Sequence, residues 1–386
     1  MKSEYSICID WIIDRVSSSI EYKSSGILKK NDLESLRQEI DQIDSNIVTL
    51  LNQRVGKAGE IGKIKEKLGV DPYDPSREEQ VFAKISSLNE GPMQIASLRT
   101  IYREVISASI ALEKDLVIGY LGPEATYTHQ AAVKNFGAGL KYQALPDIPD
   151  VFRAVEAGSC DYGVVPIENS TEGAVNRSLD LLVDSELTII SQVYLNVRHS
   201  LFSSSTLENI RQVKSKDQAL AQCADWLRLH LPDAELIPVN STAEAVCQCR
   251  EEEGIAAIAG GLAGRIYGVP ELAEGIQDRA DNVTRFLVVA QNGLPPKEGV
   301  LYRTSLVMSL ADRVGALQTV LHEFSERKIN LCKIESRPSK KKSWDYYFFI
   351  DFTGHAGDPE IEEVLTGLSA ACPFLKILGS YPETTV

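Results

Sequence analysis

The first residues that stand out for their chemistry are cations at positions where the sequence pattern calls for hydrophobic side chains. Apolar residues recur at alternating spacings of four and three from Leu36 to Leu50, as in the buried seam of a coiled-coil-like helix. Arg54 occupies the next seam position, and Lys65 follows roughly three helical turns later on nearly the same face. A charge in an apolar interface is costly unless it is paired, so these two cations predict a site for a small anion.

Other helical stretches supply polar residues to the same predicted cavity. Ser109 and Glu113 continue the apolar series of a later helix, and Asp74, Arg77 and Glu78 begin a short helix between the two. Ligand sites of helical bundles are built from such inward-facing polar side chains. For the arginine of the first helix taken alone, the alternative is a structural residue that pairs with a carboxylate to fix the register of the helices.

Arg37 lies on the same predicted helix as Lys65, but ~42 Å away at ~1.5 Å per residue. One small ligand cannot reach both residues within one helix. If both act at one site, a second subunit must supply Arg37, and the geometry then predicts a dimer of long helices.

Residues 33–114 resemble the all-helical chorismate mutases. The resemblance is carried by Leu36–Asp41, Arg54, Gly62–Lys65 and Asp74–Glu78, which keep the family's spacings. It implies a site lined by Arg37 from the second chain and by Arg54, Lys65, Asp74, Arg77, Glu78 and Ser109.

The reaction that the resemblance implies fits these residue types. Chorismate carries two carboxylates and rearranges without a nucleophile or a metal, so the enzyme must hold a compact conformer and stabilise charge on the breaking ether oxygen, a task that suits Lys65. Glu113 stands where many members have glutamine, which donates a hydrogen bond at any pH. We therefore predict that Glu113 works protonated, with its pKa raised by burial.

Three polar clusters mark the middle of the sequence: Gly122–Thr128, Pro166–Ser170 and Asp281–Phe286. The first two follow predicted strands, and ligands of α/β proteins bind at the carboxyl ends of strands. Each cluster alone is better explained as an ordinary turn with a helix cap. Together they resemble prephenate dehydratase over residues 116–292, with Ala125 where glycine is usual.

This second resemblance implies a two-lobed fold like that of periplasmic binding proteins, with the substrate in the cleft. Prephenate loses carbon dioxide and its ring hydroxyl together, and the leaving hydroxyl needs a proton or a strong hydrogen bond. Thr284 would act as a donor or relay, and Glu168 is the better-matched proton source if it lies within reach; the sequence leaves this open. The other predicted site residues are Thr126, Asn169, Ser170, Ser215, Gln222, Arg285 and Phe286.

The C-terminal residues 302–382 resemble the ACT regulatory domain that is fused to prephenate dehydratases. Alone, its two motifs would be better explained as the start of a helix and the end of a strand, but the match with a dehydratase upstream reverses this preference. The resemblance implies that they bind L-phenylalanine across a subunit interface, which would give feedback inhibition. The predicted effector residues are Gly315, Ala316, Leu317, Asn330, Leu331, Glu335, Ser336, Arg337 and Pro338.

The elements that must position these residues follow three patterns. We expect helices only over residues 29–115 beginning at Asn31 or Asp32, an α/β segment over 116–293, and a ferredoxin-like β-α-β-β-α-β segment over 302–386. The patterns predict a multidomain protein, and the resemblances imply that it combines an all-α intertwined dimer, a two-lobed α/β domain and an α+β domain. Residues 1–28 are an N-terminal extension, helical or disordered, to which we assign no function.

Composition narrows the classes of function. The net charge of -14 argues against nucleic acids and anionic membranes as partners, and no apolar run is long enough to span a bilayer. Seven scattered cysteines without a CxxC pair are read as reduced thiols of a cytoplasmic protein, and we expect neither a metal nor a cofactor. The expected ligands are chorismate, prephenate and L-phenylalanine, bound by a homo-oligomer.

Two rival functions remain at this stage. A mutase fused to a prephenate dehydrogenase would need a GxGxxG motif after a strand, and the sequence has none. A non-catalytic sensor with a decayed cleft is disfavoured by Glu168, Asn169 and Thr284, which are all intact.

Overall fold

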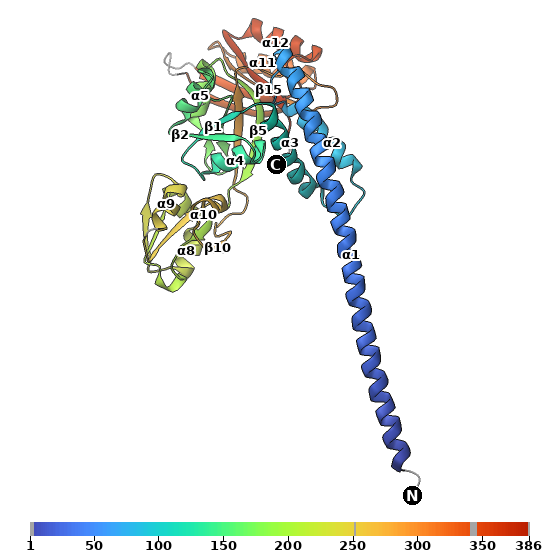
Figure 1. The fold of residues 1–386 in the computed structure, drawn as a ribbon. Helices are drawn as coiled ribbons and strands as arrows, with labels where there is room; N and C mark the ends of the chain where they lie inside the picture. Colours follow the sequence, from blue (N-terminus) through green and yellow to red (C-terminus); the bar gives the residue numbers. More distant parts are fainter. Residues whose placement is uncertain (1–3, 251, 340–345, 385–386) are drawn as a thin grey trace. The chain divides into compact units, whose positions relative to one another are not determined.

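The computed structural model describes residues 4–250, 252–339 and 346–384, with side chains from residue 32 onward. It divides into two compact units, Met1–Ile61 and Gly62–Val386. Helix α1 (Glu4–Leu68) runs without a break through Asn31 and Asp32, so the predicted helix start at these residues is wrong (Figure 1). Asparagine and aspartate favour caps but do not by themselves interrupt a helix.

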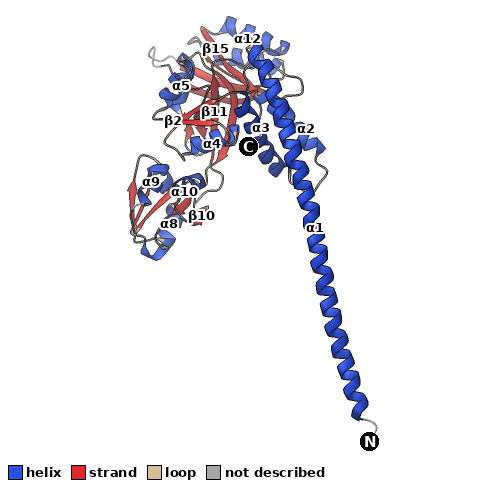
Figure 2. Cartoon of the chain, in the orientation of Figure 1, coloured by secondary structure: helices blue, strands red, loops and turns tan. Residues whose placement is uncertain are grey.

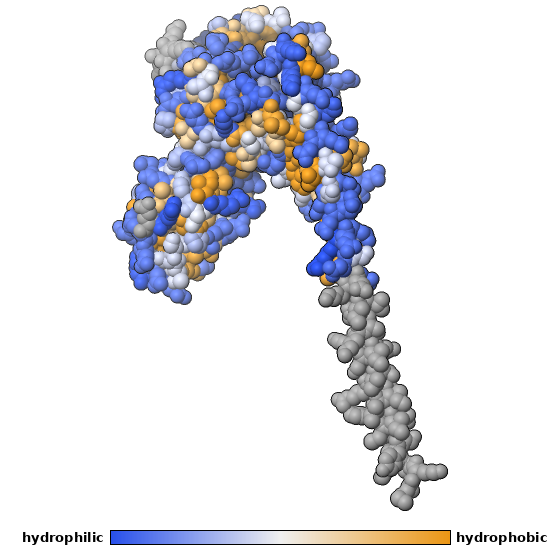
Figure 3. All heavy atoms as spheres, viewed as in Figure 1, coloured by the Kyte–Doolittle hydropathy of each residue, from blue (hydrophilic) through white to orange (hydrophobic). Residues whose placement is uncertain are grey.

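The apolar seam of α1 is exposed in the single chain. The exposed fraction of its five residues ranges from 47% for Ile47 to 62% for Leu50. Hydrophobic side chains also lie on the surface of α3 (Ile95–Glu113), where Leu112 is 68% exposed, and such residues are visible around the helical segment in Figure 3. An apolar stripe of this length on a helix is the kind of surface that a partner covers.

Helix α2 (Pro75–Leu88) begins where the sequence favours it, because proline suits the first turn and the carboxylate of Asp74 accepts a hydrogen bond from the backbone N–H of Arg77 at 3.0 Å. Phe82 of α2 and Ile106 of α3 share a hydrophobic core with the strands of the next segment. The helical residues after Gly62 are thus packed into the same compact unit as the rest of the chain.

The middle of the chain forms two lobes, each a sheet covered by helices (Figure 2). The first sheet has the order β2-β1-β3-β11-β5, with β4 paired to β3, and the second has the order β10-β6-β9-β7-β8. The chain leaves the first lobe after β5 and returns through β11, which runs antiparallel between β3 and β5. The elements of the first lobe are β1 (Val117–Leu121), α4 (Tyr127–Phe136), β2 (Lys141–Leu145), α5 (Ile148–Glu156), β3 (Tyr162–Asn169), β4 (Gly173–Ala174), α6 (Asn176–Asp184), β5 (Thr188–Asn196) and β11 (Val283–Ala290). Those of the second are β6 (Ser200–Phe202), the short 3₁₀ turn Leu207–Asn209, β7 (Gln212–Ser215), α7 (Asp217–Gln222), α8 (Ala224–His230), β8 (Glu235–Pro238), α9 (Thr242–Cys249), β9 (Ile255–Ala259), α10 (Gly261–Tyr267) and β10 (Glu271–Glu274).

The C-terminal segment has the predicted β-α-β-β-α-β order. Its antiparallel sheet has the order β13-β14-β12-β15, and β13 forms one edge. One face of the sheet packs on its own two helices, while Val307, Phe349 and Tyr381 join the core of the first lobe. The elements are β12 (Tyr302–Ser309), α11 (Ala316–Glu326), β13 (Leu331–Pro338), β14 (Tyr346–Thr353), α12 (Pro359–Ala371) and β15 (Phe374–Pro382).

Three further findings concern the described residues alone. None of their helices combines the length and the hydropathy that a membrane crossing requires. Their His, Cys, Asp and Glu side chains form no cluster suited to a metal ion. Their cysteines are free thiols, and Cys8 lies outside the described side chains.

Candidate functional sites

A cavity of about 990 Å³ is lined by residues of both lobes. The first lobe contributes the end of β3, the start of β11 and the start of α4, and the second contributes residues of α7 and the start of α9. The side chains of Thr126 and Ser241 cap α4 and α9 by accepting hydrogen bonds from the backbone N–H groups of His129 and Glu244. The cavity therefore lies next to two helix N-termini, whose backbone dipoles favour anions.

The structure sorts the predicted dehydratase residues into two groups. The residues that line the cavity are Thr126, Asn169, Gln222, Thr284 and Phe286. Those that do not are Glu168, Ser170, Ser215 and Arg285.

Two of the residues outside the cavity hold the fold together. Ser215 is buried and donates its hydroxyl to the carbonyl of Ile258 at 2.6 Å, inside the second lobe. Ser170 ties the end of β3 to the start of β11, because its hydroxyl accepts from the N–H of Val283 at 3.0 Å and donates to the carbonyl of Asp281 at 3.1 Å. Neither hydroxyl points its hydrogen-bonding groups at the cavity.

Within the cavity, side chains from both lobes form one hydrogen-bonded chain. The amide nitrogen of Asn169 donates to Oγ1 of Thr284 at 2.8 Å and to Oδ1 of Asn282 at 2.7 Å. Asn282 donates to Oε1 of Gln222 at 3.1 Å, and the same oxygen lies 2.8 Å from Nε2 of His199.

This series of hydrogen bonds ends at Tyr127. The hydroxyl of Tyr127 lies 2.8 Å from Nδ1 of His199 and 2.8 Å from the carbonyl oxygen of Arg198. His199 is almost fully buried, and burial lowers the pKa of its imidazole, although the hydrogen bond to Gln222 opposes this shift. Burial therefore favours the neutral form of the imidazole.

The pairing of β3 with β11 explains why adjacent motif residues face opposite ways. Asn169 pairs with Thr284, and Glu168 pairs with Arg285. Since successive side chains of a strand point to opposite faces, the first pair faces the cavity and the second faces the C-terminal sheet.

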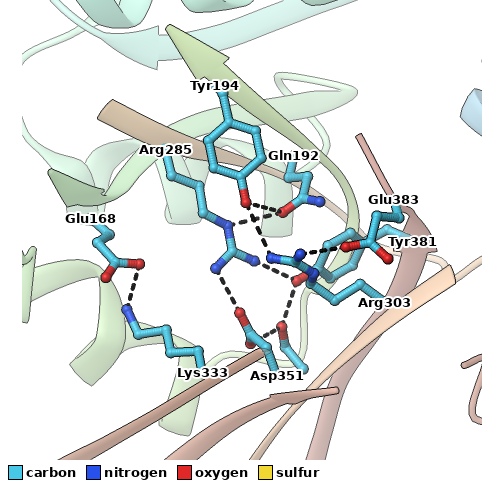
Figure 4. Close-up of polar contacts among 10 residues, drawn as sticks. Glu168, Gln192, Tyr194, Arg285, Arg303, Lys333, Asp351, Tyr381 and Glu383 are labelled. Carbon is cyan, nitrogen blue, oxygen red and sulfur yellow. Dashed lines mark hydrogen bonds and ion pairs between the residues drawn. The ribbon is translucent and has the colours of Figure 1, made fainter. Parts of the chain in front are cut away.

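Arg285 is buried among residues of the C-terminal segment (Figure 4). Its guanidinium forms an ion pair with Asp351 at 2.6 Å and donates to the hydroxyl of Tyr381 at 2.8 Å, while Nε donates to Gln192 at 2.9 Å. Burial opposes the charge, but Tyr381 and Asp351 outweigh it and raise the pKa of Arg285. The three contacts hold this side chain away from the cavity.

Glu168 makes the second contact of this kind, an ion pair with Lys333 of β13 at 2.7 Å. Two residues further along β13, Glu335 is half-buried, and Arg337 is paired with Asp180 of α6 at 2.8 Å. The residues between them, Ile334 and Ser336, are exposed. One side of β13 thus faces the first lobe.

The remaining predicted effector residues lie at the starts of α11 and β13. Gly315 is the N-cap of α11 and has a φ of 81°, a conformation that glycine adopts without steric cost. Ala316 and Leu317 follow it in the first turn, Asn330 directly precedes the edge strand, Leu331 begins that strand, and the exposed Pro338 ends it.

Ala125 also has a positive φ, of 68°. This is the conformation that favours glycine, which accounts for the glycine expected there. Here the backbone N–H of Ala125 donates to Nδ1 of the buried His129 at 3.1 Å, and the Ala125 side chain is 1% exposed within a hydrophobic core.

The predicted mutase residues after Gly62 gather between the end of α1 and helices α2 and α3. Lys65 donates to the carbonyl of Pro72 at 2.6 Å and lies 3.8 Å from the carboxylate of Glu113. Glu113 lies close against Gly62, where an added Cβ would stand 2.5 Å from its Cγ. Burial raises the pKa of Glu113, and the charge of Lys65 opposes this. The direction is the one that the sequence predicted.

Other mutase candidates contact groups that the sequence did not suggest. Glu78 is paired with Arg103 of α3, and Asp74 is paired with Lys297. Arg77 donates to Gln80 at 3.1 Å, and the buried Ser109 donates to the carbonyl of Val105 at 2.7 Å. Arg37, which is exposed, and Arg54, which is half-buried, belong to the first compact unit.

Comparison with known proteins decides the family. Models of three families match in order: chorismate mutase type II over residues 36–114, prephenate dehydratase over 118–293 and the ACT domain over 304–370. A bifunctional chorismate mutase/prephenate dehydratase of Aquifex aeolicus is 44% identical over 357 residues, which cover 91% of this chain and 98% of that protein. The chain belongs to the bifunctional chorismate mutase/prephenate dehydratases.

Two further relatives agree with membership of this family. A bifunctional chorismate mutase/prephenate dehydratase of Pseudomonas aeruginosa is 39% identical over 364 residues, with 92% of this chain and 99% of that protein covered. The solved structure of a prephenate dehydratase from Arthrobacter aurescens in complex with L-Phe is 34% identical, with a TM-score of 0.65 over 69% of this chain and 90% of that chain. The predicted family, multidomain fold class and pair of enzyme activities are confirmed.

The cleft residues that sequence reasoning missed include Tyr127, His199 and Asn282, which belong to the hydrogen-bonded series, and Lys216. A signal existed for Asn282, which stands two residues before Thr284 and therefore shares its face of the strand. The same alternation places Arg285 on the opposite face. His199 carries no signal of its own in one sequence.

Proposed function

We propose that the helical part of the chain converts chorismate to prephenate, that the cleft between the two lobes converts prephenate to phenylpyruvate, and that L-phenylalanine bound to the C-terminal domain inhibits the second step. We assign residues 29–115, 116–293 and 302–386 to these three roles. The observation that carries the proposal for the cleft is the pairing of Asn169 with Thr284 at its wall.

In the cleft, we assign to Thr284 the hydrogen bond that assists loss of the ring hydroxyl. Its oxygen accepts from Asn169, so the hydroxyl proton is available to point into the cavity. The two carboxylates of prephenate would lie near the N-termini of α4 and α9 and near Lys216, which also lines the cavity. Phe286 supplies an apolar surface for the ring.

We assign a different role to the two charged motif residues. Glu168 and Arg285 link the strands that carry Asn169 and Thr284 to the C-terminal sheet, through Lys333 and Asp351. This assignment replaces the sequence-based expectation of a proton source and a substrate-binding cation. Glu168 is the neighbour of Asn169 on its strand, and Arg285 is the neighbour of Thr284. A movement of the C-terminal sheet would therefore be passed to the two residues that line the cleft.

The mutase role requires a second copy of the chain. The exposed seam from Leu36 to Leu50 has the spacing of a helix–helix interface, and a dimer through this seam would bring in Arg37. In that dimer Arg54 and Lys65 bind the carboxylates and the ether oxygen of chorismate, while a protonated Glu113 donates a hydrogen bond. We place both reactions in the cytoplasm, because both begin from intermediates of amino-acid biosynthesis.

We further propose that L-phenylalanine inhibits the dehydratase by binding to the C-terminal domain. The Arthrobacter enzyme was solved with L-Phe bound, and the motif residues of this chain lie around α11 and along β13. An effector that binds one arrangement of the C-terminal domains better than another shifts the equilibrium towards that arrangement.

The two activities are separable by substitution. Thr284→Ala should abolish phenylpyruvate formation and leave chorismate consumption unchanged, whereas Arg54→Ala should do the reverse. Both products are measured on the purified full-length protein. Loss of both activities in either variant would contradict the two-site proposal.

A further inference from the structure

The hydrogen-bonded chain in the cleft has a direction, and Asn169 sets it. The two ends of an amide side chain have the same shape, so their neighbours decide which end is oxygen. One end of Asn169 faces the backbone N–H groups of Thr171 and Glu172 at 3.0 and 3.1 Å. Backbone N–H groups only donate, so this end must be the oxygen. The other end is therefore the NH₂ group, which donates to Thr284 and Asn282.

This orientation propagates through the next residues. Because Asn282 accepts from Asn169 with its oxygen, its NH₂ group must donate to Gln222. The atom of Gln222 that receives this bond is then an oxygen, and the ring nitrogen of His199 beside it must carry a proton. A neutral His199 is thereby fixed as the tautomer with hydrogen on Nε2.

Two donors of this hydrogen-bonded series are left for a ligand at the cleft. Among the described residues, the Thr284 hydroxyl and the NH₂ group of Gln222 donate to no protein acceptor, and both side chains line the cavity. A reversed amide at any link would instead turn an oxygen towards the substrate. For a substrate with two carboxylates, that reversal would replace attraction by repulsion.

We propose that His199 and Asn282 are positioning residues for the dehydratase reaction: they hold Gln222 and Asn169 in the one orientation that presents hydrogen-bond donors to the anionic substrate. The inference rests on the proposed function of the cleft. Neither residue donates or accepts the reacting proton in this scheme; each acts through its neighbour.

The far end of the chain shows how His199 is held. The single hydroxyl proton of Tyr127 has two acceptors, Nδ1 of His199 and the carbonyl of Arg198, both at 2.8 Å. With Nε2 protonated, a neutral His199 offers Nδ1 as an acceptor, and Tyr127 can donate to it. Both ring nitrogens of His199 are thus hydrogen-bonded, which fixes the orientation of the ring as well as its tautomer.

A double-mutant cycle tests the inference. His199→Phe keeps a ring of similar volume but removes the donor, and it should lower the kcat/KM of the dehydratase about tenfold, the effect of one lost hydrogen bond of ~1.4 kcal/mol. In a Gln222→Ala background the same change should lower kcat/KM by less than about twofold, because the side chain that His199 orients is absent. Equal losses in both backgrounds would overturn the proposal.

Three further variants separate positioning from folding. His199→Gln keeps an N–H donor and should recover most of the activity. His230→Phe is the matched control, an exposed histidine of the same lobe stacked on Trp226, and should change nothing. Asn282→Asp is nearly isosteric but turns the donor towards Gln222 into an acceptor; full dehydratase activity in this variant would also overturn the proposal. Unchanged mutase activity and thermal midpoint show that each variant is folded. A wild-type protein without dehydratase activity would instead refute the proposed function.

Discussion

The buried ion pair between Arg285 and Asp351 makes the most demanding prediction. The two side chains are 7% and 9% exposed and lie 2.6 Å apart, so each is the main counter-charge of the other in a dry environment. Removing one member of such a pair costs about 3–5 kcal/mol, because the remaining charge stays buried without a partner. We therefore expect Asp351→Asn to lower the free energy of unfolding by about that amount.

Urea denaturation of the full-length protein measures this loss. The matched control is Asp115→Asn, since Asp115 is paired with Lys141 at 2.7 Å but the two side chains are 80% and 62% exposed. That exposed pair should contribute about 0–1 kcal/mol. Replacing both buried charges, as in Arg285→Met with Asp351→Leu, should be less destabilising than either single change, because no isolated charge remains.

The same variants test the link between domains. If Arg285 couples the C-terminal sheet to Thr284, Asp351→Asn should raise the phenylalanine concentration for half-inhibition of the dehydratase at least about fivefold, the lower end of typical allosteric coupling. Mutase activity should persist. An unchanged urea midpoint together with unchanged inhibition would refute both the energetic and the functional reasoning.

Two predictions concern the mutase part. The pKa of Glu113 is raised, so its protonated form persists to higher pH than usual, and mutase activity should fall as the pH rises through that pKa. In the control variant Glu113→Gln, mutase activity should not depend on pH in this range. A wild-type activity that is independent of pH would contradict the assignment. Gly62→Ala should lower both stability, by about 1–3 kcal/mol, and mutase activity, because its Cβ would stand 2.5 Å from Glu113 Cγ. Gly59→Ala, with no atom within 4 Å of the added group, should instead be stabilising by up to about 1 kcal/mol, as circular dichroism melts of the two variants can show.

Local patterns in the sequence predicted most elements, because hydrophobic periodicity and turn residues are local signals. The helices of the first segment, the alternation of strands and helices in the middle and the β-α-β-β-α-β order at the C-terminus all agree with the expectation. The start of α1 was missed because a capping residue permits a helix to begin but does not require it.

The candidate site was predicted less completely, for a physical reason. A motif that includes Thr284 and Arg285 suggests that both line one site. In a β-strand, however, the side chains of adjacent residues point to opposite faces. Asp351 and Tyr381, which contact the guanidinium of Arg285, come from another domain, so no local pattern could name them. His199 was missed because its importance comes from what it contacts in space, and both contacts are far away in the sequence.

The placement of Arg285 bears on how far this protein is modular. In the sequence, the C-terminal domain is separated from the dehydratase segment near residues 293–302, so a truncation there would be expected to leave the dehydratase intact. In three dimensions, a truncated chain would keep the guanidinium of Arg285 on a central strand and lose Asp351 and Tyr381 together. Domain shuffling at this boundary therefore cuts through a cooperative unit, and a transplanted dehydratase would need a substitute for the missing anion before it could fold as the parent does.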